Sequence, residues 1–527
     1  MDELEVRALL RDDAFSHPAA DLDLIETHIS WVVLAGDFAY KIKKPVELEF
    51  LDFSTLALRR DCCEEELRLN RRIAPALYLG VTAITSSADG PVIGGDGDVI
   101  DYAVCMRRFS QRKLASVAAA EGRLTFARCR ELGRTVASFH NSLAPIQIDD
   151  AGDERQPGTP TAILAALRQN FAQIDDELPK GEDRSFLWDL EQSSLADYQR
   201  LESRMWDRLR DGFIRECHGD LHLGNIVLLD DKVLPFDCIE FNAAFRIVDI
   251  QCEIGFLVMD LESRSLPGHA NRVLNRWLEH TGDYAGLALH SFYDCYLSMV
   301  RAKISLISSR SESSRETGMA DFRRYFALAA AGRRRLPGFL CITMGVSGSG
   351  KSTIAEVVAA DFSAIELRSD VERKRMFGLA PDADSEEAGL TDDLYSKESS
   401  DRVFQRLVEL AELLLDAGQP VIVDATFIER ARRAPFMALA ARRKLPFVIA
   451  RFVASETELK HRLQGREKQG GGASEAGIEV MLRQQSRVEL PGTDETRHCI
   501  VVDTEADQHI ESLIGEVERR ITSHPPE

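Results

Sequence analysis

The sequence predicts two folded parts, an α+β domain over residues 1–335 and an α/β domain with a doubly wound parallel sheet over residues 336–527. Three observations support this division. A glycine-rich loop near residue 345 stands between a strand-like run and a helix-like run. Strand and helix patterns alternate after that loop. A linker-like stretch, Ala331 to Pro337, precedes the loop and places the boundary near residue 335.

The bulk composition is that of a globular protein. The chain of 527 residues is too long for one ordinary domain, and it is 44% hydrophobic and 29% charged. Its formal net charge of −21 argues against a general attraction to nucleic acid or anionic lipid and leaves room only for a local basic groove. Ten cysteines without a C-x-x-C pair indicate reduced thiols in the core, with no structural zinc site.

The first residues carry no recognisable targeting segment. Met1 to Glu5 is acidic and lacks an apolar stretch, and no run of about 18 apolar residues occurs anywhere in the chain. We therefore expect a cytoplasmic protein with no membrane association.

Two neighbouring strand patterns in the first part carry lysines. Residues 25–34 are rich in β-formers, and residues 38–43 alternate between apolar and other side chains after a short turn. Lys41 and Lys43 therefore lie on one face of the second strand. Either lysine is a candidate to project into a cleft, and the alternative is an exposed polar face.

A polar loop in the middle of the chain carries a set of metal-binding and proton-accepting side chains. Residues 217–225 contain Asp220 and Asn225, run into an apolar strand pattern, and are followed by Asp237 at the end of a second strand pattern. This arrangement is typical of kinase catalytic loops, in which the first Asp accepts the proton of a hydroxyl and the other two side chains hold Mg²⁺. The alternative is an ordinary polar turn between strands.

Two histidines in this loop are spaced as i and i+4. His218 and His222 would share one face of a helix and bind a metal there, but Gly219 and Gly224 disfavour a helix. We therefore expect them to pack against the loop or to orient it.

The loop after residue 344 fits the phosphate-binding pattern G-x-x-x-x-G-K-[ST] at every fixed position. Its backbone N–H groups close around phosphate oxygens, its lysine reaches the β and γ phosphates of a nucleoside triphosphate, and its serine binds Mg²⁺. The candidate ATP-binding residues are Gly345, Ser347, Gly348, Ser349, Gly350, Lys351, Ser352 and Thr353.

Further candidates follow from the strand pattern. Strand candidates lie at residues 364–367, 420–424, 446–452 and 498–503. The carboxyl ends of such parallel strands converge beside the phosphate loop.

Four candidate residues lie at those ends or beyond them. They are Asp370 after the strand candidate at residues 364–367, Asp424 at the end of residues 420–424, and Arg462 with Arg466 beyond residues 446–452. A base, a carboxylate on the metal side and mobile arginines suffice for phosphoryl transfer, which depends mainly on positioning and charge neutralisation. Singly, each of these residues is equally well explained as a helix cap or a surface ion pair. Asp424 is followed by Ala425, where many motor ATPases have a Glu, and this favours transfer to a hydroxyl over hydrolysis.

Through these residues the second part resembles the polynucleotide-kinase and zeta-toxin group of phosphate-loop kinases over roughly residues 338–510. The resemblance implies that Asp370 is the general base and that Arg373 contacts the substrate or the transition state. It further implies that Arg462 and Arg466 form a lid over the phosphates. Ser352, from the phosphate-loop pattern, and Asp424, from its place at a strand end, are the candidate Mg²⁺ ligands of this part.

Residues 20–310 resemble the aminoglycoside phosphotransferase and choline-kinase-like fold, a bilobal protein-kinase-like architecture. The resemblance implies that Asp220 is a base, that Asn225 and Asp237 bind Mg²⁺, and that Glu66 holds Lys41. Glu65 and Lys43 are close alternatives for this last pair. Asp249 is expected behind the site. The sequence departs from the pattern before Lys41, where residues 26–30 contain no G-x-G-x-x-G loop.

The whole chain resembles bacterial two-module proteins that join these two domains, the second of which is often named as an AAA family ATPase. We therefore expect an ATP- and Mg²⁺-dependent phosphotransferase with two kinase modules. Two alternatives stay open, a regulatory or substrate-binding first half and a nucleotide-hydrolysing switch in the second half. The acceptor, a small molecule or a nucleic acid with a free hydroxyl, and the oligomeric state cannot be deduced from the sequence, although the acidic charge weighs against a polynucleotide.

Overall fold

The computed structural model describes residues 1–48, 51–147, 156–178, 181–230, 232–309, 315–331, 338–383, 394, 396–469 and 477–523. The chain groups into two compact units, one of residues 1–260 and 303–314 and the other of residues 261–302 and 315–527. Residues 332–337 of the predicted linker lie outside the described residues, and the boundary at residue 335 stays a prediction.

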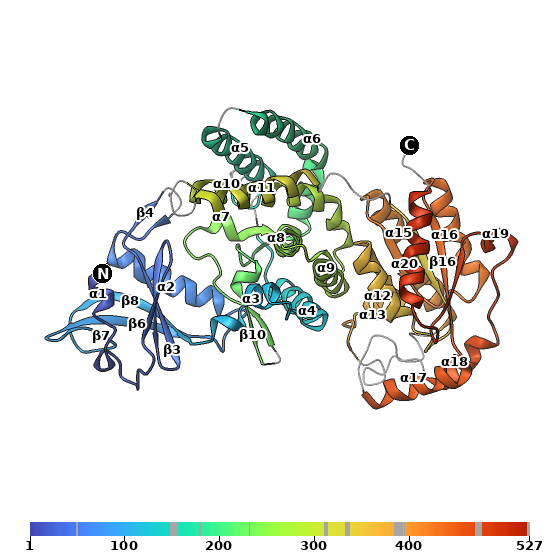
Figure 1. Ribbon diagram of the computed structural model, residues 1–527, viewed down its shortest axis with the longest axis horizontal. Helices are drawn as coiled ribbons and strands as arrows, with labels where there is room; N and C mark the ends of the chain where they lie inside the picture. Colours follow the sequence, from blue (N-terminus) through green and yellow to red (C-terminus); the bar gives the residue numbers. More distant parts are fainter. Residues whose placement is uncertain are drawn as a thin grey trace. The chain divides into compact units, whose positions relative to one another are not determined.

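The first unit begins with a mostly β region. Its antiparallel sheet has the strand order β1-β2-β3-β8-β6-β7, and helix α2 (Leu56–Asn70) packs on β8 and β6 (Figure 1). The strands are β1 (Asp23–Glu26), β2 (Ser30–Ala35), β3 (Phe38–Lys43), β6 (Tyr78–Ser87), β7 (Gly90–Ile93) and β8 (Val99–Arg107). The predicted antiparallel pair is confirmed as β2 and β3, while residues 27–29 interrupt the first pattern with a turn.

The alternation predicted for the lysine-bearing strand is confirmed. Tyr40 and Ile42 pack into a hydrophobic cluster with Val6 and Leu9, so Lys41 takes the opposite face of β3. Because α2 packs on the same sheet and carries Glu66, the lysine face meets a carboxylate.

The remainder of the first unit is mainly helical. Its helices are α1 (Glu3–Arg7), α3 (Ala115–Ala120), α4 (Phe126–Ser142), α5 (Pro160–Glu177), α6 (Glu182–Arg210), α7 (Ala243–Arg246) and most of α8 (Ile250–Ser263). Two short antiparallel pairs, β9 (Ile214–Glu216) with β12 (Ile247–Asp249) and β10 (Ile226–Leu229) with β11 (Lys232–Pro235), flank the predicted catalytic loop. Among the described residues, no helix is long and apolar enough to span a membrane.

The second unit is built on a five-stranded sheet with the order β14-β15-β13-β16-β17, in which every pair is parallel. The strands are β13 (Leu340–Met344), β14 (Ile365–Arg368), β15 (Val421–Asp424), β16 (Phe447–Val453) and β17 (Cys499–Asp503). They match the predicted strand positions closely, so the predicted parallel α/β fold is confirmed.

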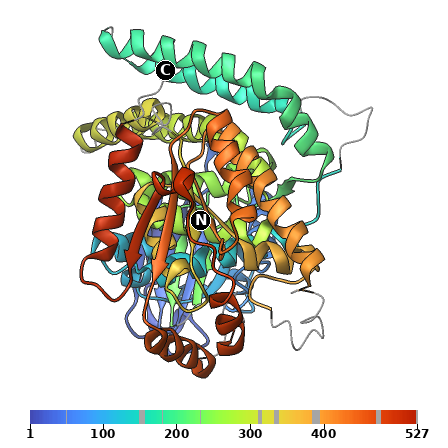
Figure 2. The same ribbon diagram turned by 90° about the vertical axis from the view of Figure 1, so that its right-hand side faces the viewer.

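Helices cover both faces of this sheet (Figure 2). They are α12 (Lys351–Asp361), α13 (Ser369–Met376), α15 (Lys397–Asp416), α16 (Arg430–Arg442), α17 (Glu456–Gln469), α18 (Ile478–Gln485), α19 (Thr493–Thr496) and α20 (His509–Thr522). The unit also contains α9 (Pro267–Thr281), α11 (Arg315–Ala331) and most of α10 (His290–Ser308), which precede the sheet in the sequence.

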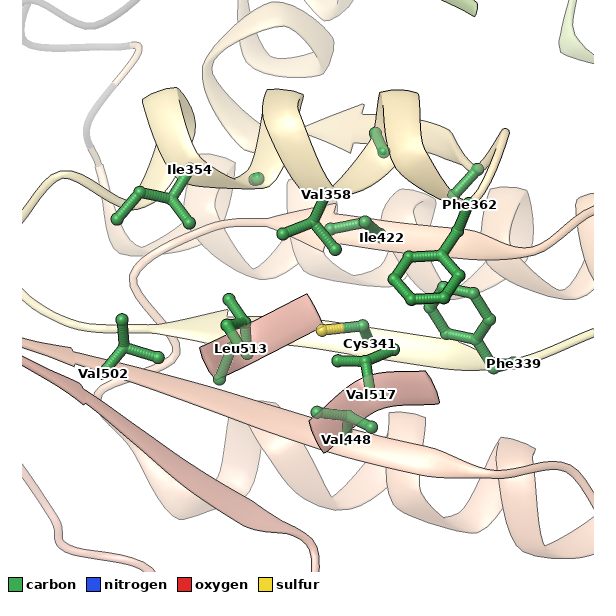
Figure 3. Packing of buried hydrophobic residues seen from close by; sticks show 14 of the residues in the cluster. Phe339, Cys341, Ile354, Val358, Phe362, Ile422, Val448, Val502, Leu513 and Val517 are labelled. Atoms are coloured by element: carbon green, nitrogen blue, oxygen red, sulfur yellow. The ribbon is translucent and has the colours of Figure 1, made fainter. Parts of the chain in front are cut away.

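One core cluster fixes the phosphate loop to the sheet. Ile354 and Val358 of α12 and Leu513 and Val517 of α20 pack with Ile422 of β15 on one face of the strands (Figure 3). Burial of such apolar side chains contributes roughly 1.5–3 kcal/mol each. The helix that follows the phosphate loop is therefore held rigidly against the strand ends.

Candidate functional site

The predicted catalytic loop of the first unit is shaped by its two histidines. Burial lowers the pKa of His218, which is therefore neutral; its Nε2 bonds the Phe236 carbonyl oxygen at 2.8 Å and its Nδ1 accepts from the Asp220 N–H at 3.3 Å. His222 Nδ1 accepts from the Gly224 N–H at 3.0 Å. Both rings thus bond the backbone of the loop, as expected from the sequence.

A glycine is required between these residues. Gly219 has a φ of +88°, and a Cβ there would lie 3.0 Å from the Phe245 carbonyl oxygen. The glycine thus permits a sharp bend of the chain directly before Asp220.

The three polar side chains predicted for phosphoryl transfer lie near one another. Asn225 Nδ2 donates to Asp220 Oδ2 at 3.0 Å, and the negative charge of Asp220 acts on Asp237. Asp237 has a φ of +67°, an uncommon value for a residue other than glycine. Such backbone strain is typical of functional positions.

Lys41 bridges α2 and the metal-ligand candidate. Its Nζ donates to Glu66 Oε1 at 2.9 Å and also forms an ion pair with Asp237. Desolvation alone would raise the pKa of Asp237, but Lys41 outweighs it, so the pKa lies below its ordinary value and the carboxylate stays ionised.

The alternatives to Lys41 and Glu66 have other partners. Lys43 is completely buried and forms ion pairs with Glu66 and Glu240. Glu65 forms ion pairs with Arg68 and Arg246. The structure therefore brings Lys41 and Glu66 together beside Asp237, and it encloses Lys43 completely as a structural cation.

Helix α8 holds the catalytic loop from behind. Glu253 Oε1 accepts from the backbone N–H groups of His218 and Gly219, each at 2.7 Å, and its Oε2 bonds His140 Nε2 at 2.8 Å. Asp260 Oδ2 accepts from the Leu223 N–H at 2.9 Å. Sequence reasoning missed both carboxylates, although their spacing of two helical turns on an apolar helix was a usable signal.

Asp249, expected behind the site, is buried and pairs with Arg208 of α6. Its two oxygens accept from Arg208 Nε and Nη2 at 2.6 and 2.7 Å, which anchors α6. Such a buried bidentate pair orients the chain that leads into α8.

His140, Cys217 and Glu253 offer ligand atoms within 4.8 Å of one another. Their chemistry does not favour a metal. Burial raises the pKa of the Cys217 thiol well above its usual value, and Glu253 is already committed to His140 and two backbone N–H groups. The cluster is better explained as the support of the catalytic loop.

The phosphate loop of the second unit connects β13 to α12. Gly350 has a φ of +84° and caps α12, as the motif requires. Lys351 is buried, and its Nζ folds back on the Val346 carbonyl oxygen at 2.9 Å. Burial lowers the pKa of Lys351, although Asp424 and Asp370 oppose the shift. A phosphate group would supply the negative partner that this buried ammonium needs.

Ser352 and Asp424 meet at the end of the sheet. Ser352 Oγ donates to Asp424 Oδ2 at 2.5 Å, and Thr343 Oγ1 donates to Asp424 Oδ1 at 3.1 Å. A hydroxyl and a carboxylate in contact form the oxygen-rich wall that Mg²⁺ prefers.

Most of the predicted residues of this unit line one pocket with a volume of about 520 Å³. They are Ser347, Gly348, Gly350, Lys351, Ser352, Thr353, Asp370, Arg373, Asp424, Arg462 and Arg466. Gly345 and Ser349 belong to the same loop but do not line the pocket.

The arginines are held by backbone oxygens and helix neighbours. Arg373 Nη1 donates to the Leu394 carbonyl oxygen at 2.8 Å. Arg462 donates to Thr504 Oγ1 at 2.8 Å and to Glu458 Oε1 at 2.7 Å. Arg462 is thus fixed beside the loop.

Sequence reasoning missed several residues of this pocket. Phe404 and Phe427 pack edge to face at 5.3 Å, and Arg432 lies over the Phe404 ring. Gln484 Oε1 accepts from the Ser347 N–H at 2.8 Å. Phe427 follows the end of β15 by three residues, so the strand-end rule extended a little further would have found it.

Comparison with known proteins assigns the two parts of the chain to two different families. The phosphotransferase enzyme family matches residues 57–290, and the AAA domain family matches residues 340–491. An uncharacterized protein of Mycobacterium tuberculosis strain H37Rv is 30% identical over 474 residues, which cover 88% of this chain and 90% of that protein. The chain belongs to this family of two-module proteins. A Mycobacterium bovis member, also uncharacterized, matches to the same extent.

Shorter or more distant likenesses add little to this family assignment. An adenylyl-sulfate kinase of Pseudomonas aeruginosa is 40% identical over 92 residues, 17% of this chain and 42% of that protein. A gluconokinase structure from Sinorhizobium meliloti covers 36% of this chain and 94% of its own, with 19% identity and a TM-score of 0.26. A choline/ethanolamine kinase family structure from Mesorhizobium loti covers 63% and 99%, with 12% identity and a TM-score of 0.37. These structural likenesses are too weak to bear on either site.

Proposed function

We propose that the protein is an ATP- and Mg²⁺-dependent phosphotransferase with two kinase modules, each of which transfers a γ-phosphate to a hydroxyl acceptor. The observation that carries the proposal is the pocket of the second unit. It presents the phosphate-loop residues Lys351 and Ser352 with Asp424 at one end, and Asp370 with Arg373 nearby. Phosphoryl transfer requires this combination of charge neutralisation and a positioned base.

The transfer step in the second unit uses these residues in turn. Asp370 accepts the proton of the acceptor hydroxyl, whose oxygen forms a bond to the γ-phosphorus as the bond to the β-phosphate oxygen breaks and ADP leaves. Lys351, Arg462 and Arg466 balance the charge on the transferring group. Ser352 and Asp424 would hold Mg²⁺, which neutralises the β and γ phosphate oxygens when bound.

The first unit offers an equivalent set of residues. Asp220 takes the hydroxyl proton, Asn225 and Asp237 would hold Mg²⁺, and Lys41, held by Glu66, binds the phosphates. The ion pair between Lys41 and Asp237 must open or rearrange when nucleotide enters, because both groups then gain partners of opposite charge.

A direct test incubates the purified protein with ATP labelled in the γ-phosphate and a metabolite extract. We expect a phosphorylated organic product from the wild type and loss of the second unit's product in Asp370→Asn. Release of inorganic phosphate alone, with no organic product from any extract, would instead support a nucleotide-hydrolysing switch.

A second candidate is that the first unit is a regulatory or substrate-binding module. The observation that favours it is the tight turn at residues 27–29, in which the Ser30 N–H donates to Thr27 Oγ1 at 2.9 Å and no glycine-rich loop follows β1. Full-length Lys351→Ala, in which the phosphate loop is disabled, separates the two candidates. Mg²⁺-dependent ATP binding that persists in this variant and disappears with Asp237→Ala added supports an active first unit, and its absence supports the regulatory one.

A further inference from the structure

Helix α9 is assigned by sequence and by packing to different parts of the protein. Residues 267–281 lie within the segment that matches the phosphotransferase family. In the structure they pack in the unit that holds the phosphate loop, and most of the helix is buried there. A helix inherited with the first module is thus part of the second.

The first role of α9 is to cover an edge of the sheet. β14 is an edge strand, and such strands expose unpaired backbone groups. Asn271 Nδ2 and Asn275 Nδ2 donate to the Ala364 carbonyl oxygen at 2.9 and 3.0 Å, and Asn275 Oδ1 accepts from the Glu366 N–H at 2.8 Å. Two asparagine side chains thus replace a neighbouring strand just before the residues that carry the candidate base.

The second role lies one turn further along α9. Glu279 Oε1 accepts from Arg368 Nη1 at 3.2 Å, and both side chains are largely buried. Arg368 ends β14 two residues before Asp370, and its Nε lies 4.0 Å from Asp424 Oδ2. Glu279 therefore holds a cation that lies beside the candidate metal-side carboxylate and two residues before the candidate base.

The end of α9 also holds α13, the helix that contains Asp370. Arg375 Nη2 donates to the carbonyl oxygens of Leu278 and Glu279 at 3.3 and 2.6 Å, where the helix dipole favours a cation. Gly282, with a φ of +73°, ends α9, and a Cβ there would lie 2.4 Å from Arg375 Nη1. Arg368 and Arg375 thus anchor the chain on both sides of Asp370.

We propose that α9 positions the acceptor side of the phosphate-loop site, with Glu279 as the positioning residue that acts through Arg368 on Asp370 and Asp424. This inference rests on the proposed function of the second unit. Without Glu279, the Arg368 guanidinium turns toward Asp424 and competes with Ser352 for that carboxylate, while α13 loses one of its two anchors.

The kinetic test uses the full-length chain with Asp220→Ala, so that only the second unit turns over. Mg²⁺·ATP with water as the only acceptor is the probe, so the measured rate is the basal hydrolysis in which Asp370 accepts the proton of the attacking water. We expect Glu279→Gln to lower kcat about tenfold while the KM for ATP stays within about twofold, because the phosphate loop is untouched. Glu279→Gln combined with Arg368→Gln should be no slower than Arg368→Gln alone. If the losses of kcat in Glu279→Gln and Arg368→Gln multiply in the double variant, the inference is wrong.

The matched control lies on the same helix. Arg272 of α9 lies seven residues before Glu279 and forms an ion pair with Glu356 of α12. Arg272→Gln weakens the docking of α9 without removing the proposed link, so any loss of kcat should multiply with that of Arg368→Gln. The same non-additivity in this control would reduce α9 to a purely structural helix and contradict the proposal.

A second readout does not depend on activity. We expect Glu279→Gln to raise amide hydrogen exchange several-fold in peptides covering residues 365–376 and to leave those covering β15 unchanged. Unchanged exchange in residues 365–376 would refute the positioning role. If the wild type shows no turnover but this change occurs, the proposed function fails and the positioning role stands. If Glu279→Gln does not fold, Glu279→Asp provides the test, with an intermediate rise expected and no rise counting against it.

Discussion

Two buried lysines share one carboxylate in the first unit, and their surroundings assign them different tasks. Lys43 is fully buried and pairs with Glu66 and Glu240, whereas Lys41 also pairs with Asp237. Removing Lys43 leaves two buried carboxylates short of a cation, so Lys43→Met should cost about 3–5 kcal/mol in the unfolding of this unit. Urea denaturation of the full chain measures it.

Lys41→Met should behave in the opposite way. Lys43 still neutralises Glu66, so the loss of stability is smaller, but the first unit loses the cation that we propose to bind the phosphates. In the Lys351→Ala background we expect ATP affinity to fall at least about tenfold. Weakened ATP binding in Lys43→Met with stability intact would show that Lys43 is the nucleotide-binding lysine.

Glu366 of β14 makes the stability of the second unit depend on pH. Burial raises the pKa of this carboxyl well above its ordinary value of 4.5; Arg368 opposes the shift, while Asp424, Glu279 and Glu356 reinforce it. When the pKa of a carboxyl is higher in the folded than in the unfolded protein, the group contributes its full stabilisation at a pH below the unfolded-state pKa. This stabilisation is lost as the pH rises through the folded-state pKa.

Glu366→Gln removes this proton equilibrium while keeping the shape of the neutral side chain. We therefore expect the Tm of Glu366→Gln relative to the wild type to increase steadily from pH 5 to pH 8 in thermal unfolding scans. A Tm difference that does not change with pH would show that the pKa of Glu366 in the folded protein is ordinary.

Among the helices, α8 supports the predicted catalytic loop of the first unit. Glu253→Gln places an amide N–H₂ group against either two backbone N–H groups or His140, which leaves one contact unsatisfied at about 1–3 kcal/mol. We expect faster amide exchange in residues 217–223.

The control for this prediction is Glu262→Gln on the same helix, where the carboxyl faces Asp294 and His290 and not the catalytic loop. It should leave exchange in residues 217–223 unchanged. Equal acceleration in both variants would show that α8 as a whole had loosened, and not that Glu253 holds the loop.

The elements that sequence reasoning predicted well are those encoded locally. The glycine spacing around Lys351 requires a phosphate loop, and apolar runs ending in Asp424 require buried strands, so both were predicted close to their final bounds. Glu279 and Asn275 resemble ordinary surface residues of an amphipathic helix. Their role depends on packing against β14, about 90 residues later in the chain, and no local pattern encodes that contact.

At the scale of the whole molecule, α9 makes the two modules inseparable by a cut at residue 335. A fragment of residues 336–527 lacks α9, so it exposes the backbone edge of β14 and the side of α12 on which α9 packs. We expect this fragment to aggregate or to melt on the order of 10 °C below a fragment of residues 261–527. Thermal scans of both fragments measure the difference, and equal Tm values would favour the predicted boundary at residue 335.

Both units are proposed to transfer phosphate to hydroxyl acceptors. The most direct measurement compares the wild type, Asp220→Ala, Asp370→Ala and the double variant with γ-labelled ATP and a metabolite library, with the phosphorylated products separated and counted. We expect each single variant to lose a different product and the double variant to make none. Unchanged phosphoryl transfer in the double variant would contradict the proposal.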